Sequence, residues 1–399
     1  MDDEVAVWTA DYFYDATAEA AALIDLKFPG KLGLYSLDRF GASRHIPGLA
    51  QKLIYQDEQL AEGVELGVPP SLQATITLSD DGMILVAPKF EKSEVSKLYV
   101  LQDGIVTNSF EAGEVGGELR VARLKDARWI SFVAADGQGL VSLPVTADIG
   151  APKERRAINR ALVVGVNTYY GEGLNSLNYA LLDAGQVYDV LSAVRENGPV
   201  FQVELGPKDR KATPNAIVEA TKRMVEGLGK GDHAVLFLAG HGLRDEQGVF
   251  YFATSQTELS DLPGTALSFD RLSAIFDASE AQITVMLDTC HSGAAGTGAF
   301  ATNDELANKL LANGANVMII SAAKGRQQSQ GRAETGGLFT HAIAQVLGGQ
   351  REKYDLNANG SIEVSEFYRG VKALVGEASS DAQTPWIIRP RMVGEYALF

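Results

Sequence analysis

The sequence predicts an α/β fold in its second part, a mainly parallel sheet flanked by helices, preceded by a small β-sandwich-like domain. Two observations lead to this prediction. From about residue 158 onward, short apolar runs alternate with segments of helical periodicity, as in strands joined by crossover helices. Between residue 69 and about residue 145, short alternating segments are separated by turn residues, as in antiparallel domains. A chain of 399 residues is long enough for two or three domains.

Residues 1–68 form an N-terminal mixed segment. It opens with several aromatic residues, Trp8, Tyr12, Phe13 and Tyr14, and continues with stretches of helical appearance. The sequence alone assigns no independent core to this segment.

Residues 69–150 form the predicted β-sandwich-like domain. The strand-like segments are 74–78, 97–101, 129–133 and 140–143. Turn signals separate them, among them Asp80-Asp81-Gly82, Asp103-Gly104 and Asp136-Gly137. The charged, proline-containing stretch 150–156 is typical of a linker, so a domain boundary is expected there.

Residues 158–395 contain the predicted parallel sheet. Residues 161–166 are an apolar run suited to a buried strand, and apolar residues at helical spacing follow between 177 and 194. Further buried strands are predicted at 234–239, 283–288 and 316–321. In open sheets of this kind, functional residues gather beyond the carboxyl ends of the strands.

Composition narrows the range of functions. The formal net charge of -16 argues against a nucleic-acid partner and suits a basic protein or peptide substrate. No apolar run approaches the roughly 20 residues of a membrane-spanning helix, and the acidic start lacks the pattern of a secretory signal. We therefore expect a cytoplasmic protein without membrane contact. The single cysteine excludes an intrachain disulfide and a multi-cysteine zinc site.

Two reactive side chains follow directly on predicted strands. His241 lies between Gly240 and Gly242 after the strand at 234–239, and Cys290 follows the strand at 283–288. A thiol peptidase needs a thiolate, a histidine that exchanges protons with it, and donors for the oxyanion. The N–H groups of Gly242 and Cys290 could be those donors. The alternative is a small buried cysteine and a structural histidine. His291 is the poorer base, because adjacent side chains on extended backbone point apart.

Residues 237–242 and 287–293 resemble the two catalytic blocks of caspase-like cysteine peptidases, most closely those of metacaspases and prokaryotic orthocaspases. The stretches 161–167, 177–184, 320–323 and 337–340 resemble other parts of the same family. The spacing of about 50 residues between histidine and cysteine also fits caspases. The resemblance covers roughly residues 158–395 and implies the caspase-hemoglobinase fold.

The resemblance implies roles for particular residues. His241 would be the base, Cys290 the nucleophile, and Asp183 and Asp288 would line the first specificity pocket. Two carboxylates there would select arginine or lysine at the cleavage site. The alternatives are a solvated helix charge for Asp183 and a strand-end carboxylate bonded to backbone for Asp288. Ala239 departs from the family pattern, because metacaspases commonly carry serine at this position.

Proteolytic activation is not required by the sequence. The segment 293–316 is short, its only basic residue is Lys309, and it therefore lacks a long excisable linker. Cleavage at Lys309, Arg326 or Arg332 remains open for a zymogen that activates itself in trans.

Residues 355–366 fit the twelve-residue calcium loop. The expected ligands are Asp355, Asn357, Asn359, Ser361 and Glu366, with glycine at position six and isoleucine at position eight. Only two of these ligands are carboxylates, which predicts weak affinity, and the loop could instead be a structural turn. No cofactor is needed for the chemistry itself.

Two functions are therefore weighed. The first is an endopeptidase that cleaves proteins after arginine or lysine. The second is a catalytically silent caspase-fold scaffold or adaptor. A separase-like or gingipain-like peptidase is a further variant, but Asp183 and the block at 288–293 favour the metacaspase branch. Residues 8–15 resemble stretches that precede caspase domains in larger prokaryotic proteins, which implies a signalling or defence assembly.

Overall fold

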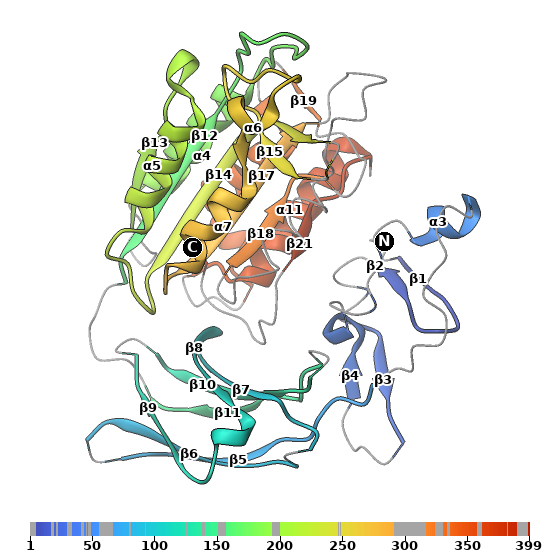
Figure 1. Cartoon of the computed structure of the whole chain (residues 1–399), viewed down its shortest axis with the longest axis vertical. Helices are drawn as coiled ribbons and strands as arrows, with labels where there is room; N and C mark the ends of the chain where they lie inside the picture. Colours follow the sequence, from blue (N-terminus) through green and yellow to red (C-terminus); the bar gives the residue numbers. More distant parts are fainter. Residues whose placement is uncertain are drawn as a thin grey trace. The chain divides into compact units, whose positions relative to one another are not determined.

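The computed structural model describes residues 5–16, 20, 23–29, 34–40, 44, 46, 49–55, 67–79, 81–91, 93–124, 127–137, 140–150, 157–193, 200–245, 247, 249–290, 317–323, 330–332, 336–356, 361–380, 382–388 and 398–399. The described residues fall into two compact units, the first formed by residues up to 150 and the second by residues from 157 onward (Figure 1).

The first unit opens with two small antiparallel hairpins. β1 (Ala6–Trp8) pairs with β2 (Tyr14–Ala16), and β3 (Asp25–Lys27) pairs with β4 (Leu34–Ser36). A 3-10 turn, η1 (Leu37–Phe40), and the short helix α3 (Leu49–Tyr55) follow. Among the described residues of this segment, the buried aromatic side chains pack together and against Leu140.

Two antiparallel sheets follow in the first unit. One contains β5 (Gln73–Leu78), β6 (Met83–Lys89) and β9 (Leu119–Ala122), and the other has the order β11-β10-β7-β8. The members of the second sheet are β7 (Lys97–Gln102), β8 (Ile105–Glu111), β10 (Trp129–Ala135) and β11 (Val145–Asp148). Ile84 and Val86 of one sheet share a buried core with Val100 and Phe132 of the other, which confirms the β-sandwich.

The predicted strand at 140–143 is wrong. Only an isolated bridge between Ala135 and Val141 forms there, and the paired strand β11 begins at Val145. The hydroxyl of buried Ser142 accepts a hydrogen bond from Ala134 N and donates to Leu143 O. Local bonds of this kind offer the backbone an alternative to the sheet ladder.

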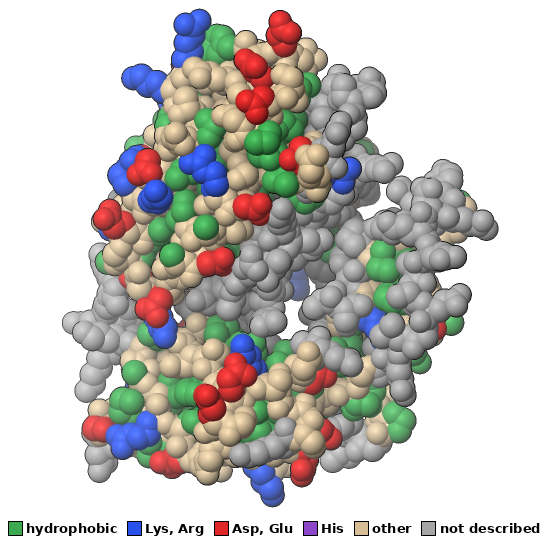
Figure 2. All heavy atoms as spheres, in the orientation of Figure 1, with side chains coloured by type: hydrophobic (Ala, Val, Ile, Leu, Met, Phe, Trp, Pro, Cys, Tyr) green, Lys and Arg blue, Asp and Glu red, His purple; other side chains and the backbone are tan. Residues whose placement is uncertain are grey.

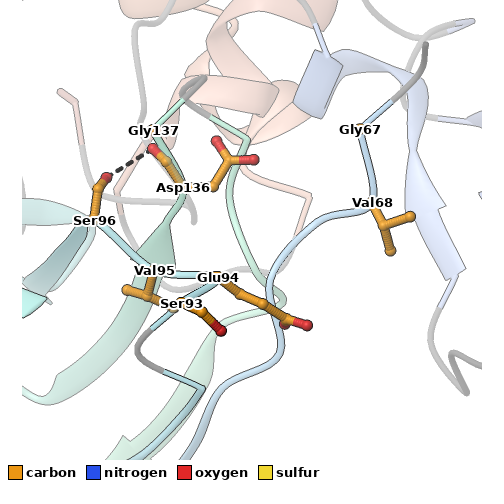
Figure 3. Close-up of a pocket in the computed structure, with 8 residues that line it drawn as sticks. All are labelled: Gly67, Val68, Ser93, Glu94, Val95, Ser96, Asp136 and Gly137. Carbon is orange, nitrogen blue, oxygen red and sulfur yellow. Dashed lines mark hydrogen bonds between the residues drawn. The ribbon is translucent and has the colours of Figure 1, made fainter.

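An open hollow of about 650 Å³ lies in the first unit (Figure 3). It is lined by Gly67, Val68, Ser93, Glu94, Val95, Ser96, Asp136 and Gly137. Among the residues that the structure describes, this lining contains neither histidine nor cysteine, the reactive groups that a thiol peptidase needs.

The second unit contains a mainly parallel sheet with the order β13-β12-β14-β17-β18-β21. Its strands are β12 (Asn159–Gly165), β13 (Phe201–Leu205), β14 (His233–Arg244), β17 (Gln282–Cys290), β18 (Val317–Ser321) and β21 (Trp386–Ile388). Only β21 runs antiparallel to its neighbour within this order. The α/β prediction is confirmed, and β12, β14, β17 and β18 overlap the four predicted strands.

Helices cover both faces of this sheet (Figure 1). α4 (Ala180–Ser192), α9 (Leu338–Leu347) and α11 (Val364–Ser379) pack together on one face, while α5 (Pro214–Val225) and α7 (Phe269–Asp277) pack on the other. This double cover explains why β14 is buried along almost its whole length and reads as a continuous apolar run.

Short elements complete the second unit. β15 (Phe250–Phe252) extends the sheet from β14 and pairs with β16 (Leu267–Ser268). β19 (Gly331–Arg332) and β20 (Gly336–Gly337) form a small hairpin. The remaining short helices are η2 (Ala112–Glu114) in the first unit, and η3 (Asp209–Lys211), α6 (Leu262–Thr265) and α10 (Arg351–Tyr354) in the second.

Two further features concern the apolarity of the helices and the distribution of charge on the surface. Among the described helices, none combines the length and apolarity needed to cross a bilayer. On the face shown in Figure 2, the described lysine and arginine side chains are scattered among aspartate and glutamate and form no continuous basic area.

Candidate active site

His241 and Cys290 lie side by side at the carboxyl ends of neighbouring parallel strands. They are register partners, His241 in β14 and Cys290 as the last residue of β17. Neighbouring strands lie about 4.8 Å apart, so the fold brings together two residues that the sequence separates by 49 positions. The side chain of Cys290 and all of His291 fall outside the described part of the chain.

The imidazole of His241 is buried, with 1% of the residue exposed, and has a defined tautomer. Its Nε2 lies 2.9 Å from the main-chain oxygen of Asn175. A carbonyl oxygen only accepts hydrogen bonds, so Nε2 carries the hydrogen. In the neutral ring the lone pair is then on Nδ1, which is the nitrogen able to take a proton from another group.

Two hydrogen bonds hold the backbone of His241. Ala253 N donates to His241 O over 2.9 Å, on the side of β15. His241 N donates to the hydroxyl of Tyr169 over 3.1 Å, and the two rings pack with their centroids 4.9 Å apart. Gly240 allows this packing, because a Cβ there would lie 2.9 Å from the Phe252 ring and 3.0 Å from the Tyr169 hydroxyl.

The N–H of Gly242 points away from β15. The bond from Ala253 N to His241 O shows that the backbone polar groups of His241 face the edge of β14 on which β15 lies. The backbone groups of successive strand residues alternate between the two edges, so those of Gly242, the register partner of Phe252, face the opposite edge. The Gly242 N–H therefore faces the side of the sheet on which β17 lies.

Asp183 and Asp288 converge from different elements and form a buried acid pair. Asp183 lies in the first turn of α4, Asp288 lies near the end of β17, and each is 3% exposed. Gly337 N donates to Asp183 Oδ1 over 2.7 Å, and the Thr340 hydroxyl donates to Asp288 Oδ2 over 3.1 Å. A Cβ at Gly337 would lie 2.8 Å from Asp288 Oδ2 and 3.3 Å from Asp183 Oδ2, so only glycine leaves room for both carboxylates.

Burial raises the pKa of Asp183 to about 8, and the neighbouring charge of Asp288 acts in the same direction. The hydrogen bond from Gly337 opposes this shift only in part. The acid pair therefore holds a proton at neutral pH unless a cation approaches it. Asp183 is not a solvated helix charge, because it is buried.

The predicted calcium loop is described in part. Asn357 and Asn359 lie outside the described residues, while Asp355, Ser361 and Glu366 lie within them. The two carboxylate oxygens of Glu366 accept hydrogen bonds from Leu356 N and Glu363 N, the latter completing a capping box at the start of α11. Among the described residues, no group of three acidic, histidine or cysteine side chains is arranged to hold a metal ion.

The loop is tied to the far end of the sheet. Ile362, at position eight of the loop, donates its N–H to Phe399 O over 2.7 Å and accepts from Leu398 N over 2.9 Å. The Phe399 ring packs against Phe201, His233 and Phe367. Burial lowers the pKa of His233 to about 4, so this histidine is neutral and structural.

Only one of the three candidate processing sites falls within the described residues. Lys309 and Arg326 lie outside them. The backbone of Arg332 is the register partner of Gly336, next to the acid pair.

Sequence reasoning did not assign Tyr169, Asn175, Gly337 or Thr340 to the site. The hydrogen bond from His241 to Tyr169 spans 72 residues and that from Gly337 to Asp183 spans 154. Contacts over such separations leave no local pattern. The one available signal was the stretch 337–340, which resembles a family block without indicating a role.

The sequence and structure were compared with protein families, curated proteins and solved structures. The profile of the Caspase domain family matches residues 158–395. No curated protein matches the sequence. Among solved structures, protein GSU0716 from Geobacter sulfurreducens is 21% identical, with a TM-score of 0.42, covering 58% of this chain and 92% of that one.

Proposed function

The chain belongs to the caspase-domain family of cysteine peptidases, and from this premise we propose that it is an endopeptidase that cleaves proteins after arginine or lysine, with Cys290 as nucleophile and His241 as base. The observation that supports the proposal most is the register pairing of His241 in β14 with Cys290 in β17. The bond of His241 Nε2 to the Asn175 carbonyl is in keeping with Nδ1 as the nitrogen that accepts a proton.

The proposed reaction has two steps. The Cys290 thiol gives its proton to His241 Nδ1, and the thiolate sulfur attacks the scissile carbonyl carbon. The oxyanion of the tetrahedral intermediate receives hydrogen bonds from the N–H groups of Gly242 and Cys290. The C–N bond then breaks, and His241 returns the proton to the leaving amine.

The second step regenerates the enzyme. Water attacks the thioester carbon, His241 takes the water proton, and the sulfur leaves as the thiolate. The products are a carboxylic acid and the amine released earlier, so neither an oxidant nor a metal enters the balance.

The acid pair sets the proposed specificity. An arginine or lysine side chain at the cleavage site would place its cation between Asp183 and Asp288 and let both carboxylates ionise. An aspartate side chain would instead add a third acid to a buried site, at a cost of several kcal/mol. These two carboxylates also favour a metacaspase-like or orthocaspase-like enzyme over an aspartate-directed one.

A panel of fluorogenic peptides ending in Arg, Lys or Asp tests the proposal. Cys290 is the chain's single cysteine, so a reversible thiol-blocking reagent acts on this residue alone. We expect cleavage after Arg and Lys that disappears on blocking and returns with reductant. Cleavage after Asp would overturn the specificity. No cleavage of any peptide would favour a zymogen or a silent scaffold.

Calcium is expected to bind weakly and not to be required for peptide cleavage. A metal ion at the loop of residues 355–366 would compete with two N–H donors for the Glu366 carboxylate. We therefore propose a dissociation constant of about 10⁻⁴ M or weaker. Calorimetric titration of the metal-free protein with CaCl₂ measures it, with Glu366→Gln as the variant that lacks the charge. Loss of cleavage in chelator, restored by micromolar calcium, would contradict this expectation.

A further inference from the structure

Tyr169 contacts the histidine of the proposed dyad through interactions that β12 and β14 themselves do not supply. The last register pair of β12 and β14 is Gly165 with Ala239, and Val166 N still donates to Ala239 O over 3.0 Å. Beyond this point β12 no longer pairs with β14. The next backbone N–H on that side of β14 belongs to His241, which is buried.

The Tyr169 hydroxyl takes the place of the missing strand partner. It accepts the hydrogen bond from His241 N over 3.1 Å and donates its own hydrogen to Val166 O over 3.0 Å. The Tyr169 side chain thus connects Val166, which follows β12, to His241 in β14. Both bonds are shielded from water, since Tyr169 is 7% exposed and His241 1%.

The ring of Tyr169 adds a second contact. Its centroid lies 4.9 Å from that of the His241 imidazole, with 38° between the planes. The hydroxyl fixes the backbone of His241, the ring packs against the imidazole, and Asn175 O bonds to Nε2. Together these contacts leave the imidazole a single orientation.

We propose that Tyr169 is a positioning residue for the reaction, acting through His241 and not on the substrate. The inference rests on the proposed Cys290–His241 dyad. The Tyr169 hydroxyl does more than fill space, because it determines the orientation of His241 Nδ1 relative to the Cys290 thiol. Geometric errors of about 1 Å in such groups reduce rates by up to about 100-fold.

The test uses Tyr169→Phe, which keeps the ring and removes the hydroxyl. Tyr368→Phe is the matched control, because Tyr368 is also buried, lies on α11 and donates its hydroxyl to a carbonyl, Pro385 O, over 3.1 Å. Both variants lose a buried hydrogen bond from a tyrosine hydroxyl to a carbonyl, and Tyr169→Phe also loses the bond accepted from His241 N. Only the Tyr169 variant disturbs the histidine.

Two readouts separate positioning from stability. The first is the pH profile of alkylation of the single cysteine, Cys290, by iodoacetamide, which needs no peptidase activity. We expect the midpoint in Tyr169→Phe to lie at least about half a pH unit above that of the wild type. The second is arginyl-peptide hydrolysis, with kcat reduced about 10-fold and KM within about twofold. Tyr368→Phe should match the wild type in both.

The outcomes are distinct. The role of Tyr169 would be overturned if the wild type showed an alkylation midpoint below that of an ordinary thiol and Tyr169→Phe showed the same midpoint and the same kcat. The dyad would still be supported in that case. An ordinary thiol profile in the wild type, without peptide cleavage, would overturn the dyad. If Tyr169→Phe does not fold, 3-fluorotyrosine at position 169 alone, which keeps the hydroxyl but weakens it as an acceptor, should shift the profile in the same direction. An unshifted profile there would refute the proposal.

Discussion

Replacing either Cys290 or His241 by alanine is expected to lower kcat/KM for arginyl peptides by about 10³- to 10⁴-fold, and replacing both should lower it no further. Without the thiol there is no nucleophile. Without the imidazole nothing removes the thiol proton or supplies one to the leaving amine. The two residues perform one step together, so their losses do not add.

Initial rates of the two single variants and of the double variant provide the measurement. His341→Ala is the control, because His341 lies on α9, is exposed, and bonds to Gln345 on its own helix. It should retain wild-type activity. More than about a tenth of the activity remaining in His241→Ala would show that another group supplies the proton, and the dyad would then be wrong.

The reactive residues of this site are predicted from the sequence because both sit in strands, whereas Asp183, on helix α4, is reached only through the family resemblance. His241 and Cys290 each follow an apolar run long enough to identify, and the topological rule for parallel strands places both at one edge of the sheet. Their direct register pairing is an observation that only the three-dimensional structure supplies. The shift of the last strand of the sandwich from 140–143 to Val145–Asp148 shows the limit of alternation patterns, because the bonds of Ser142 compete locally with pairing.

The supporting residues escape sequence analysis for a physical reason. Gly337 matters because two carboxylates occupy the space of its absent Cβ, and both come from elements far away in the chain. Tyr169 matters because β12 ends one residue too early to satisfy His241 N. Each role depends on where a segment distant in the sequence ends or packs. Local periodicity in the sequence contains no information on such contacts.

The acid pair is expected to bind a cation with release of a proton. Burial and the charge of Asp288 raise the pKa of Asp183 to about 8, so at pH 7 the empty pair holds a proton that an arginine side chain should expel. Affinity for an arginyl peptide should then rise by up to about tenfold per pH unit toward pH 8 and level off above it. Calorimetry on Cys290→Ala, in two buffers of different ionisation enthalpy, measures both the affinity and the protons released.

Removing the charge of either carboxylate of the acid pair should reduce the preference for arginyl peptides. Asp288→Asn and Asp183→Asn are each expected to lower kcat/KM for arginyl peptides by about 100-fold or more, because the substrate cation is left partly unpaired in a buried site. Asp189→Asn is the matched control, since Asp189 lies on the same helix α4 but is exposed. Equal losses in all three variants would mean that net charge, and not the acid pair, attracts the substrate.

The raised pKa of Asp183 also predicts that the free energy of unfolding falls as pH rises, whereas the affinity for an arginyl peptide rises. Between the unfolded pKa of about 3.8 and the folded value of about 8, the native state binds the Asp183 proton more tightly than the unfolded state. Stability therefore falls as pH rises through this window. Asp183→Asn should remove that loss and raise the Tm at pH 8 relative to the wild type, by about 2–4 °C per kcal/mol regained, with a smaller gain at pH 5.

An enzyme that selects cations with buried carboxylates is strained while the site is empty, and a variant that is both less active and more stable at pH 8 is the signature of that strain. A lower Tm at pH 8 would instead show that the hydrogen bond from Gly337 outweighs the cost of burial, and that the empty pair is already ionised.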